Sequence, residues 1–361
     1  MKNARRMSLG VIGLTAVGAT ALCAALLPAA RAATQSSPET SSVAAAAALP
    51  QPAIDPAFPT FVHLPADQAA HKGADNEWWY TIGHLSAGRH QYGYEVQLSA
   101  AGIAQIALTD VTAGTYASQQ TVFAPGQFTA STTGLSVRTP IASLSGPLHG
   151  MRLTADLPHG IGTLSLTLDD VGPTLYANGT GLIPFLGGTS YYYSLPHLRT
   201  VGTLTIGGKA QHVTGESWLD RQWGDWDWTT LKRWTWMGIQ LGNGTALTVA
   251  DVFDASGEHH WATVLSPDGA ESVVPVTPLA ATATDYQTSP VTGQRYAGKW
   301  IVRIPSLHAT LIVTARPVLQ EVQTGIPFTP GIDEADSTVR GSYLGHAVTG
   351  TAVVEQFGIW K

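Results

Sequence analysis

Tryptophan and charged residues alternate within one short segment of the chain, residues 215–236. Six of the eleven tryptophans lie there beside acidic and basic side chains: Trp218, Trp223, Trp226, Trp228, Trp234 and Trp236, with Glu216, Asp220, Arg221, Asp225, Asp227, Lys232 and Arg233. An indole ring is costly to leave in water and carries a π-face with one N–H donor. Ionisable groups among so many indoles favour the wall of a cavity for an apolar or cationic guest, where carboxyl groups take shifted pKa values. The alternative is a β-structure with an aromatic inner face and a charged outer face.

The candidate acid, Asp251, ends the strand-like run 247–251, two residues beyond Val249 and on the same face. Burial on an apolar face disfavours the ionised form of a carboxyl group and raises its pKa. A neutral Asp251 could then protonate an alkene or donate a hydrogen bond to a carbonyl oxygen. The alternative is structural: Asp251 pairs with an arginine or caps the strand before the turn at 254–257.

The candidate substrate-binding residues are aromatic or lie beside aromatic blocks. They are Trp78, Tyr80, Trp218, Trp223, Trp228 and Trp236, with Glu77 and His84. Several π-faces together could stabilise a carbocation, each by about 0.5–2 kcal/mol, although the same rings could simply pack two domains together. His84 could relay a proton or hold a water, because histidine titrates near neutrality, or it could be a hydrogen-bonded structural group.

Motifs for other chemistries are absent from the sequence. His259 and His260 have no third metal ligand at a recognisable spacing, and no H-E-x-x-H motif is present. Gly215-Glu-Ser217 is followed by tryptophan and leucine, so it is not the nucleophile elbow of a serine hydrolase. The chain also lacks a phosphate loop and a dinucleotide fingerprint, so we expect no metal and no cofactor.

The first 32 residues have the pattern of an export signal. A basic start with Lys2, Arg5 and Arg6 precedes an apolar run at 9–27 and an Ala-Arg-Ala cleavage-like site at 30–32. We therefore expect an exported protein (secreted, periplasmic or at the cell surface), which leaves by the Sec route or, given the paired arginines, the twin-arginine route. After cleavage we expect no membrane span. Residues 33–54 are rich in Ala, Ser, Thr and Pro and are predicted to be a disordered spacer.

The remaining chain is acidic and has no cysteine. Four of the 19 basic residues lie in the signal, which leaves 15 against 25 acidic residues. Nucleic acid is therefore excluded as an expected partner. The single cysteine, Cys23, also lies in the signal, so the exported protein has neither disulfides nor thiolate chemistry.

Short runs with a period of two residues predict an all-β protein. Examples are 92–98, 162–168, 245–253 and 307–313, each bounded by Gly, Pro, Asn or Asp turns. Regular short strands with turns between them predict antiparallel sandwiches or barrels. An aromatic-started strand with a glycine turn occurs both at 79–88 and at 236–244, which indicates two related halves. We place them at 55–205 and 206–361.

Three sequence blocks resemble one known family. They are EWWY at 77–80 with GHL at 83–85, YYYSLP at 191–196 and GESWLDRQWG at 215–224. In this order they look like the signature blocks of the AttH/carotenoid 1,2-hydratase family, which includes the hydroxyneurosporene synthases. The resemblance runs from about Asp75 to the C-terminus. It implies two consecutive lipocalin-like (calycin-type) antiparallel β-barrel domains, with an apolar pocket at or near their junction.

The resemblance also suggests roles for particular residues. Asp220 and Trp223 match an aspartate and a tryptophan of the hydratases, and Asp251 falls at the position of their proton-donor aspartate. Arg221 stands where the hydratases have histidine, and Val249 replaces a tyrosine. Arg221 could pair with the neighbouring Asp220 or polarise a substrate carbonyl. The candidate catalytic residues are therefore Asp251, Asp220 and Arg221.

Members of this family differ in chemistry, and three functions stay open. The first is acid-assisted hydration or cyclisation of a C=C bond in a polyene, isoprenoid or polyketide. The second is a Diels–Alder-type pericyclase without proton transfer, in which Arg221 or Asp251 activates a carbonyl. The third is a lipocalin-like carrier of a hydrophobic small molecule, with no chemistry. Replacing Asp251 by Asn should abolish the first activity and leave ligand binding by a carrier almost unchanged.

Overall fold

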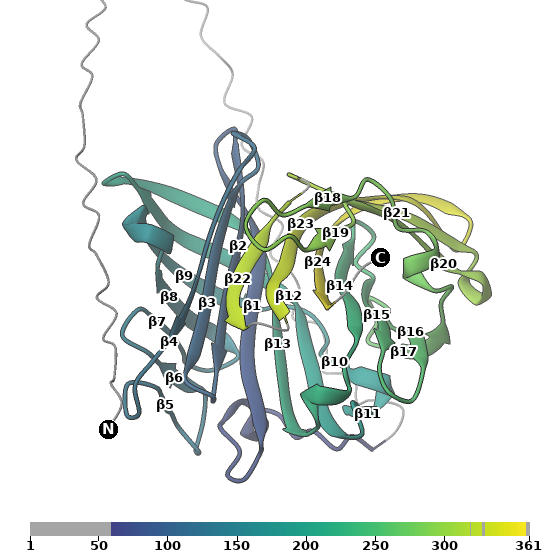
Figure 1. The fold of residues 1–361 in the computed structure, drawn as a ribbon, viewed down its shortest axis with the longest axis horizontal. Coiled ribbons are helices and arrows are strands. Elements are labelled where there is room, and N and C mark those ends of the chain that lie inside the picture. The colour runs from purple at the N-terminus through teal and green to yellow at the C-terminus, as the bar shows by residue number, and fades with distance from the viewer. Residues whose placement is uncertain (1–58, 318, 327–328, 359–361) are drawn as a thin grey trace, which may run out of the picture. The chain divides into compact units, whose positions relative to one another are not determined.

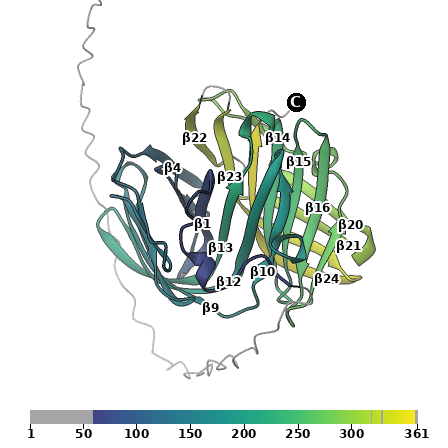
Figure 2. The same ribbon diagram turned by 90° about the horizontal axis from the view of Figure 1, so that it is seen from below.

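Nearly every regular element is an antiparallel β-strand, as the period-2 runs predict. The computed structural model describes residues 59–317, 319–326 and 329–358. The predicted export signal (1–32) and spacer (33–54) lie outside the described residues. The strands form two large curled sheets, shown side by side in Figures 1 and 2.

The first sheet has thirteen strands and contains the purple and teal elements of Figure 1. Its strands are β1 (Asn76–Ala87), β2 (His90–Ser99), β3 (Ile103–Asp110), β4 (Thr115–Val122), β5 (Thr129–Ala130), β6 (Ser136–Arg138), β7 (Ala142–Ser145), β8 (His149–Asp156), β9 (Gly162–Asp170), β10 (Leu175–Tyr176), β11 (Leu182–Phe185), β12 (Gly188–Ile206) and β13 (Lys209–Asp225). They are ordered β4-β3-β2-β1-β13-β12-β9-β8-β7-β6-β5, and β10 and β11 pair with β12.

The second sheet has nine strands, drawn in green and yellow in Figure 1. Its strands are β14 (Arg233–Leu241), β15 (Ala246–Phe253), β16 (Glu258–Leu265), β17 (Glu271–Pro275), β20 (Lys299–Ile304), β21 (Ala309–Ala315), β22 (Glu321–Ile326), β23 (Thr329–Tyr343) and β24 (His346–Gly358). They are ordered β17-β16-β15-β14-β24-β23-β21-β20, and β22 pairs with β23. The short strands β18 (Gln287–Thr288) and β19 (Arg295–Tyr296) form a separate hairpin.

The described part of the chain has six single-turn 3-10 helices in its connections. They are η1 (Ala66–Gln68), η2 (Pro158–Gly160), η3 (Ala177–Gly179), η4 (Trp228–Thr230), η5 (Leu279–Ala281) and η6 (Pro305–Leu307). Within the described residues, none of the helices is both long and apolar enough to span a membrane.

The two sheets share one topology, which explains the repeated sequence pattern. In each sheet the first strand pairs with the second and also with the last, so that β1 lies between β2 and β13, and β14 lies between β15 and β24. The aromatic-started hairpins expected at 79–88 and 236–244 are β1–β2 and β14–β15. The two-barrel prediction is confirmed.

The change from the first sheet to the second falls between β13 and β14, at residues 226–232. The predicted division at 205/206 lies instead at the tip of the β12–β13 hairpin, where Ile206 pairs with Lys209. Gly207 and Gly208 make this turn with φ of 55° and 78°, a left-handed conformation that favours glycine. The tryptophan-rich segment is therefore split between the two sheets.

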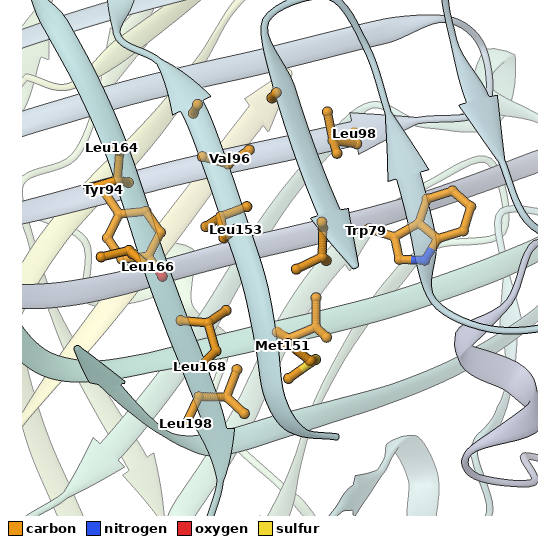
Figure 3. Close-up of a cluster of buried hydrophobic side chains, with 14 of the residues drawn as sticks. Trp79, Tyr94, Val96, Leu98, Met151, Leu153, Leu164, Leu166, Leu168 and Leu198 are labelled. Carbon is orange, nitrogen blue, oxygen red and sulfur yellow. The ribbon is translucent and has the colours of Figure 1, made fainter. Parts of the chain in front are cut away.

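Each strand presents one face to the inside of its own barrel and the other to the outside. The inner face of the first sheet encloses a core of Leu, Val, Met and aromatic side chains, part of which, including Trp79, Leu153 and Leu166, is shown in Figure 3. The second sheet encloses a separate core around Met237, Val249 and Trp300. On β13, Leu219, Arg221 and Trp223 point inward, whereas Trp218, Asp220 and Gln222 point outward.

Candidate active site

The outer faces of the two sheets meet in a buried layer, which we call the junction. It lies between β1, β2, β12 and β13 of the first sheet and β14, β23 and β24 of the second. Hydrogen bonds cross it from Tyr80 Oη to Glu334 Oε2 (2.5 Å) and between His84 Nδ1 and Asp336 Oδ2 (2.7 Å). Since outward strand positions normally meet water, the polar residues found here are buried only because one barrel covers the other.

Asp220 lies in the junction with a full set of neutral donors. Its carboxyl group accepts hydrogen bonds from Ser194 Oγ (2.5 Å), Trp218 Nε1 (2.6 Å) and Tyr192 Oη (2.8 Å). The side chain is 4% exposed. Burial raises the pKa of Asp220 to about 7, although the three donors favour the ionised form and oppose this rise. Asp220 can therefore release a proton or accept one near neutral pH.

Aromatic rings cover Asp220 on the side of the second sheet. The ring of Trp236 is edge-on to those of Trp218 and Tyr80, with a centroid separation of 6.1 Å in both cases. Tyr80 is also the direct neighbour of Asp220 on the adjacent strand. A positive charge that develops beside Asp220 would face these aromatic π-systems.

Three glutamates face one another across the junction, and we call them the carboxyl row: Glu95, Glu334 and Glu355. Glu334 and Glu355 are paired neighbours on β23 and β24, and Glu95 approaches from β2. Burial and the charge of Glu355 raise the pKa of Glu95 to about 8. Burial raises that of Glu355 to about 8 as well, with a contribution from Asp220. Burial, Glu95 and Glu355 also raise the pKa of Glu334.

Large aromatic side chains form one edge of the junction. Trp226 and Trp234 are buried there, and Trp78, Trp228, Phe185 and Phe357 pack around them while staying partly exposed. Trp228 Nε1 donates to Asn76 Oδ1 at 2.7 Å, which fixes its ring. The partly exposed rings supply apolar surface at the edge of the layer that holds Asp220.

Arg221 lies inside the first barrel, on the opposite face of β13 from Asp220. Its guanidinium donates to Glu77 Oε1 (2.7 Å), Ala69 O (2.6 Å) and Trp78 O (2.9 Å), and it lies 3.9 Å from the ring centroid of Trp79. Burial would raise the pKa of Glu77, but hydrogen bonds from His71 and the charge of Arg221 outweigh it and lower the pKa. The expected ion pair of Arg221 is thus formed with Glu77 and not with Asp220, because consecutive strand residues point to opposite faces.

Trp223 belongs to the same inner group. Its ring is stacked between His71 (4.0 Å between centroids) and Tyr191 (5.5 Å). Arg221, Glu77 and Trp223 therefore hold one end of the first barrel together, away from the junction.

Asp251 points into the second barrel, on the same face as Val249 as expected. Its Oδ2 accepts hydrogen bonds from the backbone N–H groups of Leu279 (2.7 Å) and Ala280 (3.2 Å), and its Oδ1 is 3.8 Å from Arg233. This geometry matches the structural alternative, in which the carboxylate caps a turn and pairs with an arginine.

The predicted site residues thus fall into two groups. The junction brings together Asp220, Trp78, Tyr80, His84, Trp218, Trp228 and Trp236, whereas Glu77, Arg221, Trp223 and Asp251 lie inside the barrels. The sequence reasoning missed Tyr192, Ser194 and the carboxyl row. Period-2 alternation from Asp220 and from the 191–196 block would have placed Tyr192 and Ser194 on the outer face. Nothing in the sequence shows that this face is covered.

The fold and the junction define a protein of two lipocalin-like barrels with an acidic and aromatic layer between them. The AttH-like family model matches residues 56–355, and the chain belongs to this family. The family expected from the three sequence blocks is therefore confirmed.

Individual relatives agree with this assignment. The fold is similar to that of an AttH protein from Nitrosomonas europaea (TM-score 0.73, 20% identity, 86% of this chain and 99% of that chain). It is also similar to kievitone hydratase from Nectria haematococca (TM-score 0.70, 19% identity, 84% of this chain and 94% of that chain). Dehydratase asqC from Emericella nidulans is 28% identical over 203 residues, which are 54% of this chain and 57% of that protein. The chain thus spans little more than half the length of this curated relative.

Proposed function

We propose that the protein is an enzyme that adds water to, removes water from, or cyclises an apolar molecule at a C=C bond, with Asp220 as the acid. The observation that carries this proposal is a buried carboxyl group that three neutral donors hold in place, and burial raises its pKa to about 7. A general acid is most effective when its pKa lies near the working pH. We further propose that the substrate is a polyene, an isoprenoid or a polyketide, and that the protein is exported.

The proposed reaction begins with proton transfer from Asp220 to an alkene carbon or to a leaving hydroxyl group. The resulting carbocation is stabilised by the π-faces of Trp218, Trp236 and Tyr80. A water molecule then bonds to the cation and loses a proton in hydration, and an adjacent carbon loses a proton in dehydration. In cyclisation, an internal double bond supplies the electron pair, and a carbon next to the new cation then loses a proton. The dehydratase relative supports this reaction type by its name.

The geometry gives less support to the alternative that Arg221 activates a carbonyl group in a pericyclase. Each described contact of its guanidinium is made inside the first barrel, to Glu77, to backbone carbonyls and to aromatic rings. Asp251 is likewise engaged with backbone N–H groups in the second barrel. Neither side chain faces the junction.

The test is incubation of the protein with an apolar extract of the producing cells in D₂O, followed by mass spectrometry. Hydration, or cyclisation started by proton transfer to carbon, places one deuterium on carbon. Dehydration is recognised by the loss of one water, and a pericyclic conversion leaves the mass unchanged. Compounds that bind and return unaltered would indicate a carrier and contradict the proposal.

Two variants make this test specific. We expect Asp220→Asn to lower turnover by roughly 10²–10⁴-fold, the usual contribution of a positioned general acid. Asp170→Asn is the matched control. Asp170 lies on β9, outside the junction, and burial raises its pKa to about 6. Full turnover by folded Asp220→Asn would rule out Asp220 as the acid.

A further inference from the structure

A small cavity adjoins the carboxyl row, and Glu95 and Glu334 line it. Its volume is about 10 Å³, roughly the room that one water molecule needs. The polar groups in its wall come from four strands: Glu95 on β2, Thr109 on β3, Tyr116 on β4, and Glu334 and Asp336 on β23. A cavity walled by so many polar groups is suited to a hydrogen-bonded water rather than to apolar atoms.

The groups that line this cavity have unused hydrogen-bonding capacity. Both carboxyl oxygens of Glu95 are buried without a hydrogen-bond partner among the described residues, and so is Glu334 Oε1. The Glu95 side chain is only 3% exposed. A buried carboxyl group without hydrogen-bond partners destabilises the folded state, and a water in the cavity would remove that cost.

The cavity also reaches a histidine–carboxylate pair that leads to solvent. Asp336, in the cavity wall, accepts hydrogen bonds from His84 Nδ1 (2.7 Å) and from Arg316 Nη2 (2.9 Å). The side chains of His84 and Arg316 are 16% and 29% exposed. Gly93 lets Asp336 approach this closely, since a Cβ there would lie 2.7 Å from its Oδ2.

At its other end the carboxyl row lies near the acid of the proposed reaction, since the charge of Asp220 acts on Glu355. Glu334 accepts a hydrogen bond from Tyr80, which is the cross-strand neighbour of Asp220. Glu355 is the cross-strand neighbour of Trp236. Each strand that packs on the carboxyl row contributes titratable groups to its surroundings. They are Tyr80 and His84 on β1, Tyr116 on β4, Tyr192 on β12, Asp220 on β13 and Asp336 on β23, with Arg316 beside Asp336.

We propose that the carboxyl row is a proton-transfer route between Asp220 and solvent, with Asp336 and His84 at its solvent end. After Asp220 has given its proton to substrate, each carboxyl group along the row gives one proton toward Asp220 and accepts one from the solvent side. His84 passes a proton to Asp336 and takes one from water, so protons balance and no electron is transferred. The purpose of the route rests on the proposed function, but its existence can be tested without substrate.

The test follows the exchange of buried carboxyl protons with D₂O by time-resolved infrared spectroscopy at pH 7. The C=O stretching band of a protonated carboxyl group shifts when COOH becomes COOD, so its rate reports proton transfer to the row. In His84→Gln, which keeps a hydrogen-bond donor but cannot pass a proton, we expect exchange about 10²-fold slower than in the wild-type protein. His197→Gln is the matched control, because His197 pairs with Glu216 (3.1 Å) away from the cavity, and it should exchange at the wild-type rate.

Two further measurements separate proton transfer from a structural effect. Added imidazole should restore fast exchange in His84→Ala, which mere loss of packing would not allow. Glu95→Gln should remove one protonated carboxyl band, and the exchange rate of that band in the wild-type protein should depend on His84. Glu271→Gln should remove a different band, whose exchange rate does not depend on His84. Burial raises the pKa of Glu271 to about 7, outside the row.

Wild-type exchange rates in His84→Gln, or no protonated carboxyl band from Glu95 at pH 7, would overturn the route. These outcomes are independent of the proposed function. If Asp220→Asn is inactive and exchange in His84→Gln is unchanged, the proposed function is supported and the proton route is contradicted. If exchange in His84→Gln is slow and Asp220→Asn is active, the proton route is supported and Asp220 is not the acid.

Discussion

Tyr80 on β1 donates a 2.5 Å hydrogen bond to Glu334 on β23, and this contact links the two barrels. The hydroxyl group and the carboxyl group are both buried, and the strand register places Asp220 directly beside Tyr80. The tyrosine is thus in contact with the second barrel while it flanks the candidate acid of the first. The packing of the barrels and the environment of Asp220 are therefore coupled through one side chain.

Replacing Tyr80 by Phe should destabilise the protein by roughly 1–3 kcal/mol, because it leaves Glu334 Oε2 buried without its donor. The same change should raise the pKa of Glu334 further, since the Tyr80 hydrogen bond lowers it. Urea denaturation at pH 6 measures the first effect.

In a double-mutant cycle of Tyr80→Phe with Glu334→Gln, the free-energy changes of the two substitutions should be non-additive by about 0.5–3 kcal/mol. Tyr94→Phe, which removes a hydrogen bond to Ser217 inside the first barrel, should be additive with Glu334→Gln. Additivity in both cycles would show that the Tyr80–Glu334 contact contributes nothing.

The stability of the protein should fall as the pH rises from about 4.5 to about 8. The pKa of Glu95 is about 8 in the folded protein against 4.5 ordinarily. Because the folded chain holds this proton more tightly than the unfolded chain, the stability it contributes is full below pH 4.5 and is lost as the pH approaches 8. Each such group steepens the fall of the free energy of unfolding with pH within its window. Glu355 has the same window, and that of Asp220 runs from 3.8 to about 7.

Unfolding by urea at pH 5, 6, 7 and 8 measures this dependence. Glu95→Gln should reduce the slope, since glutamine does not titrate, whereas Asp227→Asn, on an exposed turn, should leave it unchanged. A slope in Glu95→Gln equal to that of the wild-type protein would mean that Glu95 is ionised in the folded state.

The sequence predicts the fold because strand alternation, glycine turns and the repeated aromatic hairpin are local properties. The Gly207–Gly208 turn illustrates the limit of local reasoning. The repeated aromatic hairpin leads to a predicted domain boundary beside it, whereas the two glycines form a hairpin that keeps β13 in the first sheet. Which strand belongs to which sheet depends on pairing between distant segments, which a single sequence does not show.

The candidate site was predictable to the extent that strand periodicity applies. Alternation places Trp218 and Asp220 on one face of β13 and Arg221 on the other, so Arg221 and Asp220 cannot act together. Glu95 occupies a polar position within the alternating run 92–98, which on the sequence alone indicates a solvent-exposed face. Its burial arises from contact with β23, and so the carboxyl row could be found only in three dimensions.

Arg221→Gln should destabilise the protein by about 3–5 kcal/mol, because it leaves the carboxylate of Glu77 buried without its ion-pair partner. Thermal or urea denaturation gives this value. Adding Glu77→Gln should recover part of the loss, since the unpaired charge is then removed. Turnover per folded molecule should stay close to that of the wild-type protein, as Arg221 faces the first barrel and not the junction. A folded Arg221→Gln variant with turnover as low as that of Asp220→Asn would instead place Arg221 in the reaction.

Asp251→Asn decides between the two candidate acids. The carboxylate of Asp251 accepts hydrogen bonds from the first two backbone N–H groups of η5 and lies near Arg233, so its neutral replacement should cost about 1–3 kcal/mol of stability. Asp254→Asn is the matched control, because Asp254 also accepts backbone N–H bonds, from Ser256 and Gly257. Both variants should lose stability and keep turnover in the D₂O assay, whereas Asp220→Asn should lose turnover. Loss of turnover in folded Asp251→Asn alone would move the proton donor from the junction into the second barrel, where the family resemblance places it.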